Sequence, residues 1–250
     1  MCTGFKLSSS DFASSPTFLS GERRHQVPNK QGSNVIVDLE EEATNFIQKL
    51  NETTGNIISW GLTSKYGYWS SNETKKYTVK ALVNGMKCEN GVNDRVPPNI
   101  ARKLFVWNIT HGISSPLRLT TMVTVPMIRE KGVPGTKITI DVNKKTKIIL
   151  SKKVSLKKAS NEVVERWSQS CPFIASVSFD GWFAYETTDV RNGPENGTKY
   201  KTVGVGSLRN PSKGLINASD HILTYTLRGI FWQQFWWRRE QATYKHYLIG

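Results

Sequence analysis

The sequence has few of the side chains that build catalytic or metal centres. Its 250 residues include 3 cysteines and 4 histidines, and none of them share the spacing of a zinc site. Cys2, Cys88 and Cys171 form no Cys-x-x-Cys pair, so we predict no disulfide scaffold and a reducing compartment. No glycine-rich phosphate-binding loop is present. We therefore expect a protein that is not an enzyme and needs no cofactor or metal.

Long hydrophobic runs are also missing. No stretch reaches the roughly 18 apolar residues of a transmembrane helix, and residues near the N-terminus lack the apolar core of a secretory signal. Residues 1–34 are rich in Ser, Gly and Pro and predict a flexible arm. We expect one core domain over residues 35–250, which ends in a strand-rich aromatic extension.

Acidic residues are scarce compared with basic ones. There are 34 Lys and Arg against 20 Asp and Glu, a formal net charge of +14. Such an excess favours a polyanionic partner, which is a nucleic acid, an anionic membrane surface or a nucleoprotein. It carries no information about the fold.

The spacing of apolar residues predicts about three helices. The first begins at the N-cap Asp38 and presents one apolar face up to Leu50. A second follows Pro97-Pro98 and carries Trp107, and a third runs from Ser160 to Trp167.

Alternation of apolar and polar residues predicts the strands. The expected strands cover residues 76–83, 117–125, 137–142, 147–158, 173–179, 182–187, 200–208 and 221–227. Asp180-Gly181 between two of them is typical of a hairpin turn. The predicted fold class is α+β, a single domain with a mixed, mostly antiparallel sheet packed by these helices.

A lysine-rich segment is the first candidate binding site. It contains no acid, and we predict that it binds a polyanion through these residues: Lys144, Lys145, Lys147, Lys152, Lys153, Lys157 and Lys158. A nuclear import receptor would recognise the same cluster. The alternative is a solvated strand whose lysines protect a sheet edge from pairing. The sequence leaves both interpretations open.

An aromatic run near the C-terminus is the second candidate. Indole rings favour the membrane–water boundary and arginines favour anionic headgroups, so we predict membrane contact by Phe231, Trp232, Phe235, Trp236, Trp237, Arg238 and Arg239. The alternative is that period-two alternation buries Phe231, Phe235 and Trp237 in the core.

The order of elements from Lys75 to Thr187 resembles that of rhabdovirus matrix proteins, which are small, basic, cysteine-poor proteins with an N-terminal arm and an α+β core. Lys75-Lys-Tyr-Thr-Val-Lys-Ala-Leu-Val83 stands where that family has its first core strand. The Trp107 helix, the strand at residues 117–125 and the helix at residues 160–167 follow in the same order.

The resemblance implies a viral structural protein of the virion. Such a protein condenses the nucleocapsid and its RNA against the inner face of the envelope during assembly and budding, and it self-associates. It also implies host membranes and, for the plant-infecting branch that replicates in the nucleus, the host nucleus. One departure is that Pro97-Pro98 is followed by Asn-Ile and not by the Pro-Pro-x-Tyr pattern of late-budding motifs.

A second hypothesis is a single-stranded nucleic-acid-binding movement or capsid protein of a plant virus. Gly135-Thr-Lys-Ile-Thr-Ile-Asp141 has the glycine–strand–aspartate pattern of the movement proteins. A capsid protein is expected to form closed shells, whereas a matrix protein is not.

Overall fold

The computed structural model describes residues 34–70, 75–89, 100–128, 135–153, 163–188 and 198–239. They belong to one compact unit, Ser33–Gly250. The predicted arm, apart from Asn34, lies outside the described residues, as do Lys157 and Lys158.

The described chain is mostly β-structure, so the predicted α+β class with about three helices was wrong. It contains one α-helix, α1 (Leu39–Thr54), and three short 3-10 helices, η1 (Gly67–Ser70), η2 (Val205–Leu208) and η3 (Pro211–Lys213). The strands are β1 (Val35–Asp38), β2 (Ile57–Gly61), β3 (Lys80–Cys88), β4 (Ile100–Ser114), β5 (Thr120–Val125), β6 (Thr136–Asp141), β7 (Lys147–Lys153), β8 (Val163–Asp180), β9 (Trp182–Thr188), β10 (Thr198–Gly204), β11 (Ile216–Ser219) and β12 (Ile222–Arg239).

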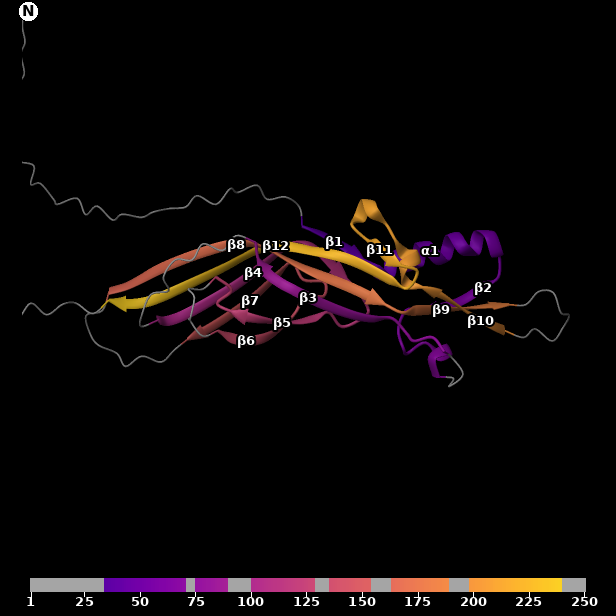
Figure 1. Cartoon of the computed structure of the whole chain (residues 1–250), viewed down its shortest axis with the longest axis horizontal. Helices are drawn as coiled ribbons and strands as arrows, with labels where there is room; N and C mark the ends of the chain where they lie inside the picture. Colours follow the sequence, from indigo (N-terminus) through magenta and orange to yellow (C-terminus); the bar gives the residue numbers. More distant parts are fainter. Residues whose placement is uncertain are drawn as a thin grey trace, which may run out of the picture. The chain divides into compact units, whose positions relative to one another are not determined.

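Three long strands form the centre of a seven-stranded sheet. β8 and β12 have 18 residues each and pair antiparallel along their whole length, and β4, with 15 residues, pairs with the second half of β12. The strand order is β1-β4-β12-β8-β3, with β7 also on β4 and β11 also on β12 (Figure 1). Shorter strands therefore extend the edges of a long central ribbon. β5 and β6 form a separate two-stranded sheet.

Two segments predicted as helices belong, in their described parts, to these long strands, whereas Pro97-Pro98 and residues 160–162 lie outside the described residues. Trp107 belongs to β4 and Trp167 to β8. In β4 the buried residues Phe105, Trp107 and Ile109 alternate with half-buried ones, which is the period of a strand with one covered face. We call the face of the seven-stranded sheet that carries Phe105 and Trp107 the inner face, and the opposite one the outer face.

Pro172 shows why a proline does not end β8. Its carbonyl accepts a hydrogen bond from the Glu89 amide at 2.8 Å, at the point where β3 ends. Because the N–H and C=O of one strand residue point to the same side, the missing N–H of Pro172 faces this sheet edge and not β12. The ladder between β8 and β12 is therefore continuous through Ile230–Pro172.

The helix expected after Asp38 is confirmed. The Asp38 carboxylate accepts hydrogen bonds from the amides of Glu40, at 2.9 Å, and Glu41, at 3.3 Å. Buried Glu42 joins the helix to η3, because it accepts hydrogen bonds from Lys213 Nζ at 2.6 Å and Asn210 Nδ2 at 2.9 Å. Burial opposes ionisation of Glu42, but these bonds and the positive charge of Lys213 prevail and lower its pKa.

The predicted hairpin at Asp180-Gly181 is not formed, although both flanking strands exist. β8 lies in the seven-stranded sheet, whereas β9 pairs with β10 and β2 in a three-stranded sheet. The chain thus crosses between sheets at Gly181, whose φ is 132°. A Cβ there would lie 2.7 Å from the carbonyl oxygen of Thr78, so the crossing requires glycine.

Two of the cysteines form a disulfide, contrary to the sequence-based expectation. Cys88 at the end of β3 is bonded to Cys171 in β8, with 83 residues of separation. Neither cysteine has a partner nearby in sequence, so spacing alone did not reveal the pair. The disulfide joins an edge strand to the centre of the sheet. None of the helices in the described ranges has the length and apolar character needed to cross a membrane.

Candidate functional site

The hairpin β5–β6 covers part of the inner face without joining the seven-stranded sheet. Its two strands have six residues each and pair antiparallel from Thr120–Asp141 to Val125–Thr136. Among the described residues, neither strand pairs with a strand outside the hairpin. Side chains, rather than a backbone ladder, therefore hold most of the hairpin in place.

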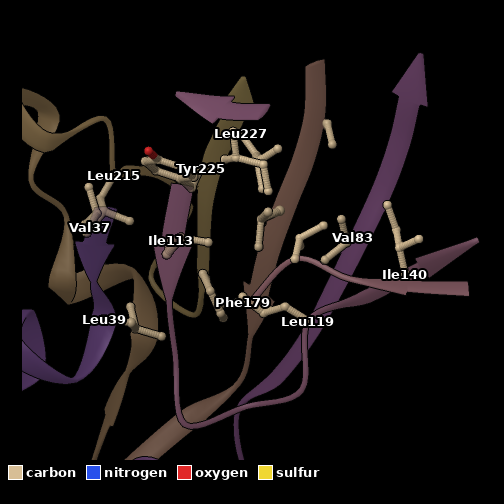
Figure 2. Close-up of a cluster of buried hydrophobic side chains, with 14 of the residues drawn as sticks. Val37, Leu39, Val83, Ile113, Leu119, Ile140, Phe179, Leu215, Tyr225 and Leu227 are labelled. Atoms are coloured by element: carbon tan, nitrogen blue, oxygen red, sulfur yellow. The ribbon is translucent and has the colours of Figure 1, made fainter. Parts of the chain in front are cut away.

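The hairpin has one apolar and one polar face. Buried residues point to the inner face and include Leu119, Val123, Val125, Ile140 and Val142. Figure 2 shows Leu119 and Ile140 among Ile113, Phe179 and Val83 of the large sheet. The opposite row is at least partly exposed and contains Arg118, Thr120, Met122, Thr124, Lys137, Thr139 and Asp141. Met122, with 64% of its surface exposed, is the one large apolar residue in this row.

Asn143 closes the base of the hairpin. Its Nδ2 donates to the carbonyls of Ser115 at 2.8 Å and Leu117 at 3.1 Å, and its Oδ1 accepts from the Ser115 amide at 2.9 Å. The amide of Lys144 then donates to the carbonyl of Ile113 in β4 at 3.0 Å. The base is thus bonded to the large sheet through the backbone at β4.

Gln233 holds the other end of the hairpin, and we call this contact the glutamine clasp. Its fully buried side chain donates to the carbonyl of Ile128 at 2.6 Å and accepts from the Ile128 amide at 3.4 Å. Its Nε2 also lies 2.6 Å from Oε1 of Gln169. Beside it, Trp107 Nε1 donates to the sulfur of Met127 at 3.2 Å. The clasp places polar bonds inside an otherwise apolar layer, so it fixes the hairpin end in one register.

The predicted polyanion-binding lysines lie at a sheet edge. Lys144 and Lys145 occupy the turn before β7, and both are exposed, as are Lys147 and Lys152 on β7. Lys153 ends β7, but its side chain is outside the described part. In the described chain β7 pairs only with β4, so the position also suits edge protection.

The predicted membrane-contact residues divide between the two faces of β12. Phe231 and Phe235 are fully buried on the inner face, where Phe231 packs at 5.0 Å from the ring of Trp107. Trp232 and Trp236 point to the outer face by strand alternation, and they and Trp237 are half-buried. Arg238 and Arg239 are the last two residues of β12, and their side chains lie outside the described part of the structure.

The topology brings the two predicted segments together. β4 lies between them, with β7 on one side and β12 on the other. Val106 is paired with both Ile149 of β7 and Trp232 of β12, so these side chains share the outer face. The residues that the sequence did not reveal are Gln233, Gln169 and Asn143. Uncharged amides in strand patterns give no signal until the fold places them.

Comparisons with known proteins give no family. No family model matches the sequence, and no curated protein matches it. Among solved structures, a non-toxic crystal protein from Bacillus thuringiensis aligns with a TM-score of 0.54 at 9% identity, covering 81% of this chain and 94% of its own.

Two further structures align more loosely. They are the binary complex of Cry23Aa1 and Cry37Aa1 (TM-score 0.44, 12% identity, 80% of this chain and 85% of that one) and the Mpp75Aa1.1 beta-pore-forming protein from Brevibacillus laterosporus (0.30, 10%, 81% and 87%). At these TM-scores neither supports an argument about this chain. The first alignment shows a shared β fold and nothing about activity.

Proposed function

We propose that this protein acts on membranes and perforates them by inserting the β5–β6 hairpin. The observation that carries the proposal is the hairpin itself, which alternates between an apolar and a polar face on both arms and, in the described part of the chain, joins no larger sheet. A membrane-spanning strand that borders an aqueous channel needs this alternation, because one face meets lipid and the other meets water.

Within the described residues, the first arm of the hairpin has enough chain to cross a bilayer. A tilted transmembrane strand needs about 9–11 residues, whereas β5 and β6 have six each. The alternation extends beyond β5 to Leu117 and beyond β6 to Val142, and Pro126, Met127 and Ile128 continue the first arm. Recruiting these flanking residues gives the first arm the required length.

The apolar face keeps the hairpin folded back in water. Releasing it exposes Leu119, Val123, Val125, Ile140 and Val142, which costs on the order of 10 kcal/mol if each side chain is worth about 2 kcal/mol. Insertion places the same side chains against lipid and offsets that cost. The hairpin is therefore expected to leave the sheet only at a membrane.

A single hairpin in a bilayer would leave the outer edges of both strands without hydrogen-bond partners. Hairpins from several copies satisfy each other by pairing edge to edge around a common lumen. The polar row then faces the lumen. Among the described residues of that row the charges are those of Arg118, Lys137 and Asp141.

The test is ionic conductance across planar bilayers, preceded by release of a dye trapped in vesicles. Lys137→Glu reverses one exposed charge of the polar row and is expected to shift the reversal potential toward cation selectivity without changing stability. Lys65→Glu makes the same charge change at an exposed position outside the hairpin and is the matched control. Vesicle binding without conductance or dye release would refute the proposal.

The matrix-protein hypothesis is tested by none of these observations and remains an alternative. The elements named for its second and third helices are strands in β4 and β8. The exposed Lys144, Lys145, Lys147 and Lys152 still favour a polyanion partner. A matrix protein is expected to condense RNA or nucleoprotein while leaving vesicles intact, so the same dye-release assay separates the two functions.

A further inference from the structure

The outer face of the sheet carries a mixed patch of tryptophans, arginines and aliphatic residues toward the C-terminal end of β12. The residues of this patch lie in rows across neighbouring strands. Trp236 stands between Arg102 of β4 and Arg166 of β8, and Trp232 stands between Val106 and Ser170. We call this surface the Trp–Arg patch; its residues are Arg102, Leu104, Val106, Ile149, Arg166, Trp232 and Trp236.

Among the described residues, nothing covers the patch completely, and most of its side chains reach solvent. Arg102 and Arg166 are exposed, Ile149 has 58% of its surface exposed, and the two tryptophans are half-buried. The guanidinium of Arg102 lies over the ring of Trp236, with 4.8 Å from Cζ to the ring centroid. Stacking holds this arginine against the sheet.

The charge of the patch has one sign. The surrounding outer-face positions are Asn108, Lys147, Ser151, Ser168, Ser170, Pro172, Ile230 and Gln234, and none of them or of the patch residues is acidic. Two arginines and a lysine, with no acidic residue among these described outer-face positions, are complementary to a dense anionic surface. A guanidinium offers two parallel donors to a phosphate, and indole rings favour the level of the headgroups.

The patch lies close to the part of the hairpin that would enter the membrane first. Gln233, which clasps Ile128, stands in β12 directly after Trp232. The patch and the distal end of the hairpin therefore occupy the same stretch of β12, on opposite faces of one sheet. A protein bound through this patch holds the hairpin end about one sheet thickness, roughly 10 Å, from the headgroups.

We propose that the Trp–Arg patch binds the phosphates of anionic phospholipid headgroups and docks the protein before insertion. The inference rests on the proposed membrane function and names its partner. The arginines bind phosphate, the tryptophans enter the headgroup layer, and the exposed isoleucine adds apolar contact.

The test is co-sedimentation with vesicles of neutral phosphatidylcholine, with and without about a third phosphatidylserine. The double variant Arg102→Gln/Arg166→Gln is expected to bind the anionic vesicles about 10- to 30-fold more weakly, since each basic residue near an anionic surface contributes about a factor of five. Arg209→Gln/Lys65→Gln removes the same charge at exposed positions outside the patch and is expected to keep most of the affinity. Arg102→Lys/Arg166→Lys is expected to bind at an intermediate level, because charge is kept but the bidentate geometry is lost.

Equal binding by the patch variant and its control would overturn the inference, as would wild-type binding that is the same for neutral and anionic vesicles. Loss of RNA binding in the patch variant with unchanged vesicle binding would also overturn it and assign the patch to a nucleic acid. Dye release separates the two proposals. If the hairpin proposal fails, wild-type protein binds anionic vesicles without releasing dye; if the patch proposal fails, dye is released equally by the patch variant and its control.

Discussion

Replacing Gln233 with methionine is the perturbation that bears most directly on how the hairpin is held. Methionine keeps the length and volume of the side chain but cannot bond to Ile128 or to Gln169. Three polar groups then lose a partner, namely the buried amide and carbonyl of Ile128 and the part-buried Oε1 of Gln169. The two shorter of these bonds are both 2.6 Å.

The expected cost follows from those groups. An unsatisfied buried polar group costs about 1–3 kcal/mol, so loss of the two short bonds destabilises the closed hairpin by about 2–6 kcal/mol. Since each 1.4 kcal/mol changes an equilibrium constant tenfold, the population of the open hairpin rises about 30-fold or more. Because the clasp joins only the distal end of the hairpin to the sheet, the effect should be local.

Hydrogen exchange measures this directly. In Gln233→Met the amides of β5 are expected to exchange about 30-fold faster or more, while those around Ala43 in α1 keep their protection. Gln234→Met, at the neighbouring outer-face position, is the matched control. Faster dye release by the first variant alone should accompany the change. Unchanged exchange in β5, or an equal loss of protection in α1, would show that Gln233 does not hold the hairpin closed.

Two further predictions concern stability. Cys171→Ser removes the disulfide to Cys88, and closing a loop of 83 residues is worth about 4.5 kcal/mol in the chain-entropy model. Chemical denaturation of the variant should therefore show a free energy of unfolding that is lower by up to this amount. Reductant should lower the stability of the wild type to the same extent and have no effect on the variant. Because the pKa of Glu42 is lowered in the folded protein, its ion pair with Lys213 stabilises the fold at pH values above the ordinary carboxyl pKa of 4.5. This stabilisation is lost as the pH falls through the folded-state pKa, so the Tm difference between wild type and Glu42→Gln should shrink below about pH 4.5. A Tm difference that stays constant with pH would contradict the assignment.

The local patterns that the sequence predicted well are those with one clear period. The helix after Asp38 has a side-chain cap and an apolar stripe, and the strands at residues 117–125 and 137–142 have clean alternation. Which strands pair with each other was harder to predict from the sequence. Nothing local distinguishes Asp180-Gly181 in a hairpin from the same dipeptide in a crossing between two sheets, because the choice is made by Thr78 and other distant residues.

The predicted helices at Trp107 and Trp167 failed for a physical reason. Around Trp107 in β4, every second residue is buried, and intervening residues such as Leu104 and Val106 are also apolar; around Trp167 in β8, partly buried residues alternate with exposed ones. Residues three and four apart are then both hydrophobic, which imitates a helical stripe. The two candidate binding segments could be identified from composition, but their meeting on one face depends on β4 and was visible only in the fold.

Entry of the β5–β6 hairpin into the bilayer can be followed with an environment-sensitive dye on single cysteines at neighbouring positions. The dye is placed at Ile138, on the apolar face, or at exposed Thr139, in a Cys2→Ser background where Cys88 and Cys171 remain bonded. On addition of anionic vesicles, the dye at residue 138 is expected to become brighter and to be quenched by nitroxide lipids, while the dye at residue 139 stays in water. Equal responses at the two positions, or none at either, would contradict insertion of this hairpin.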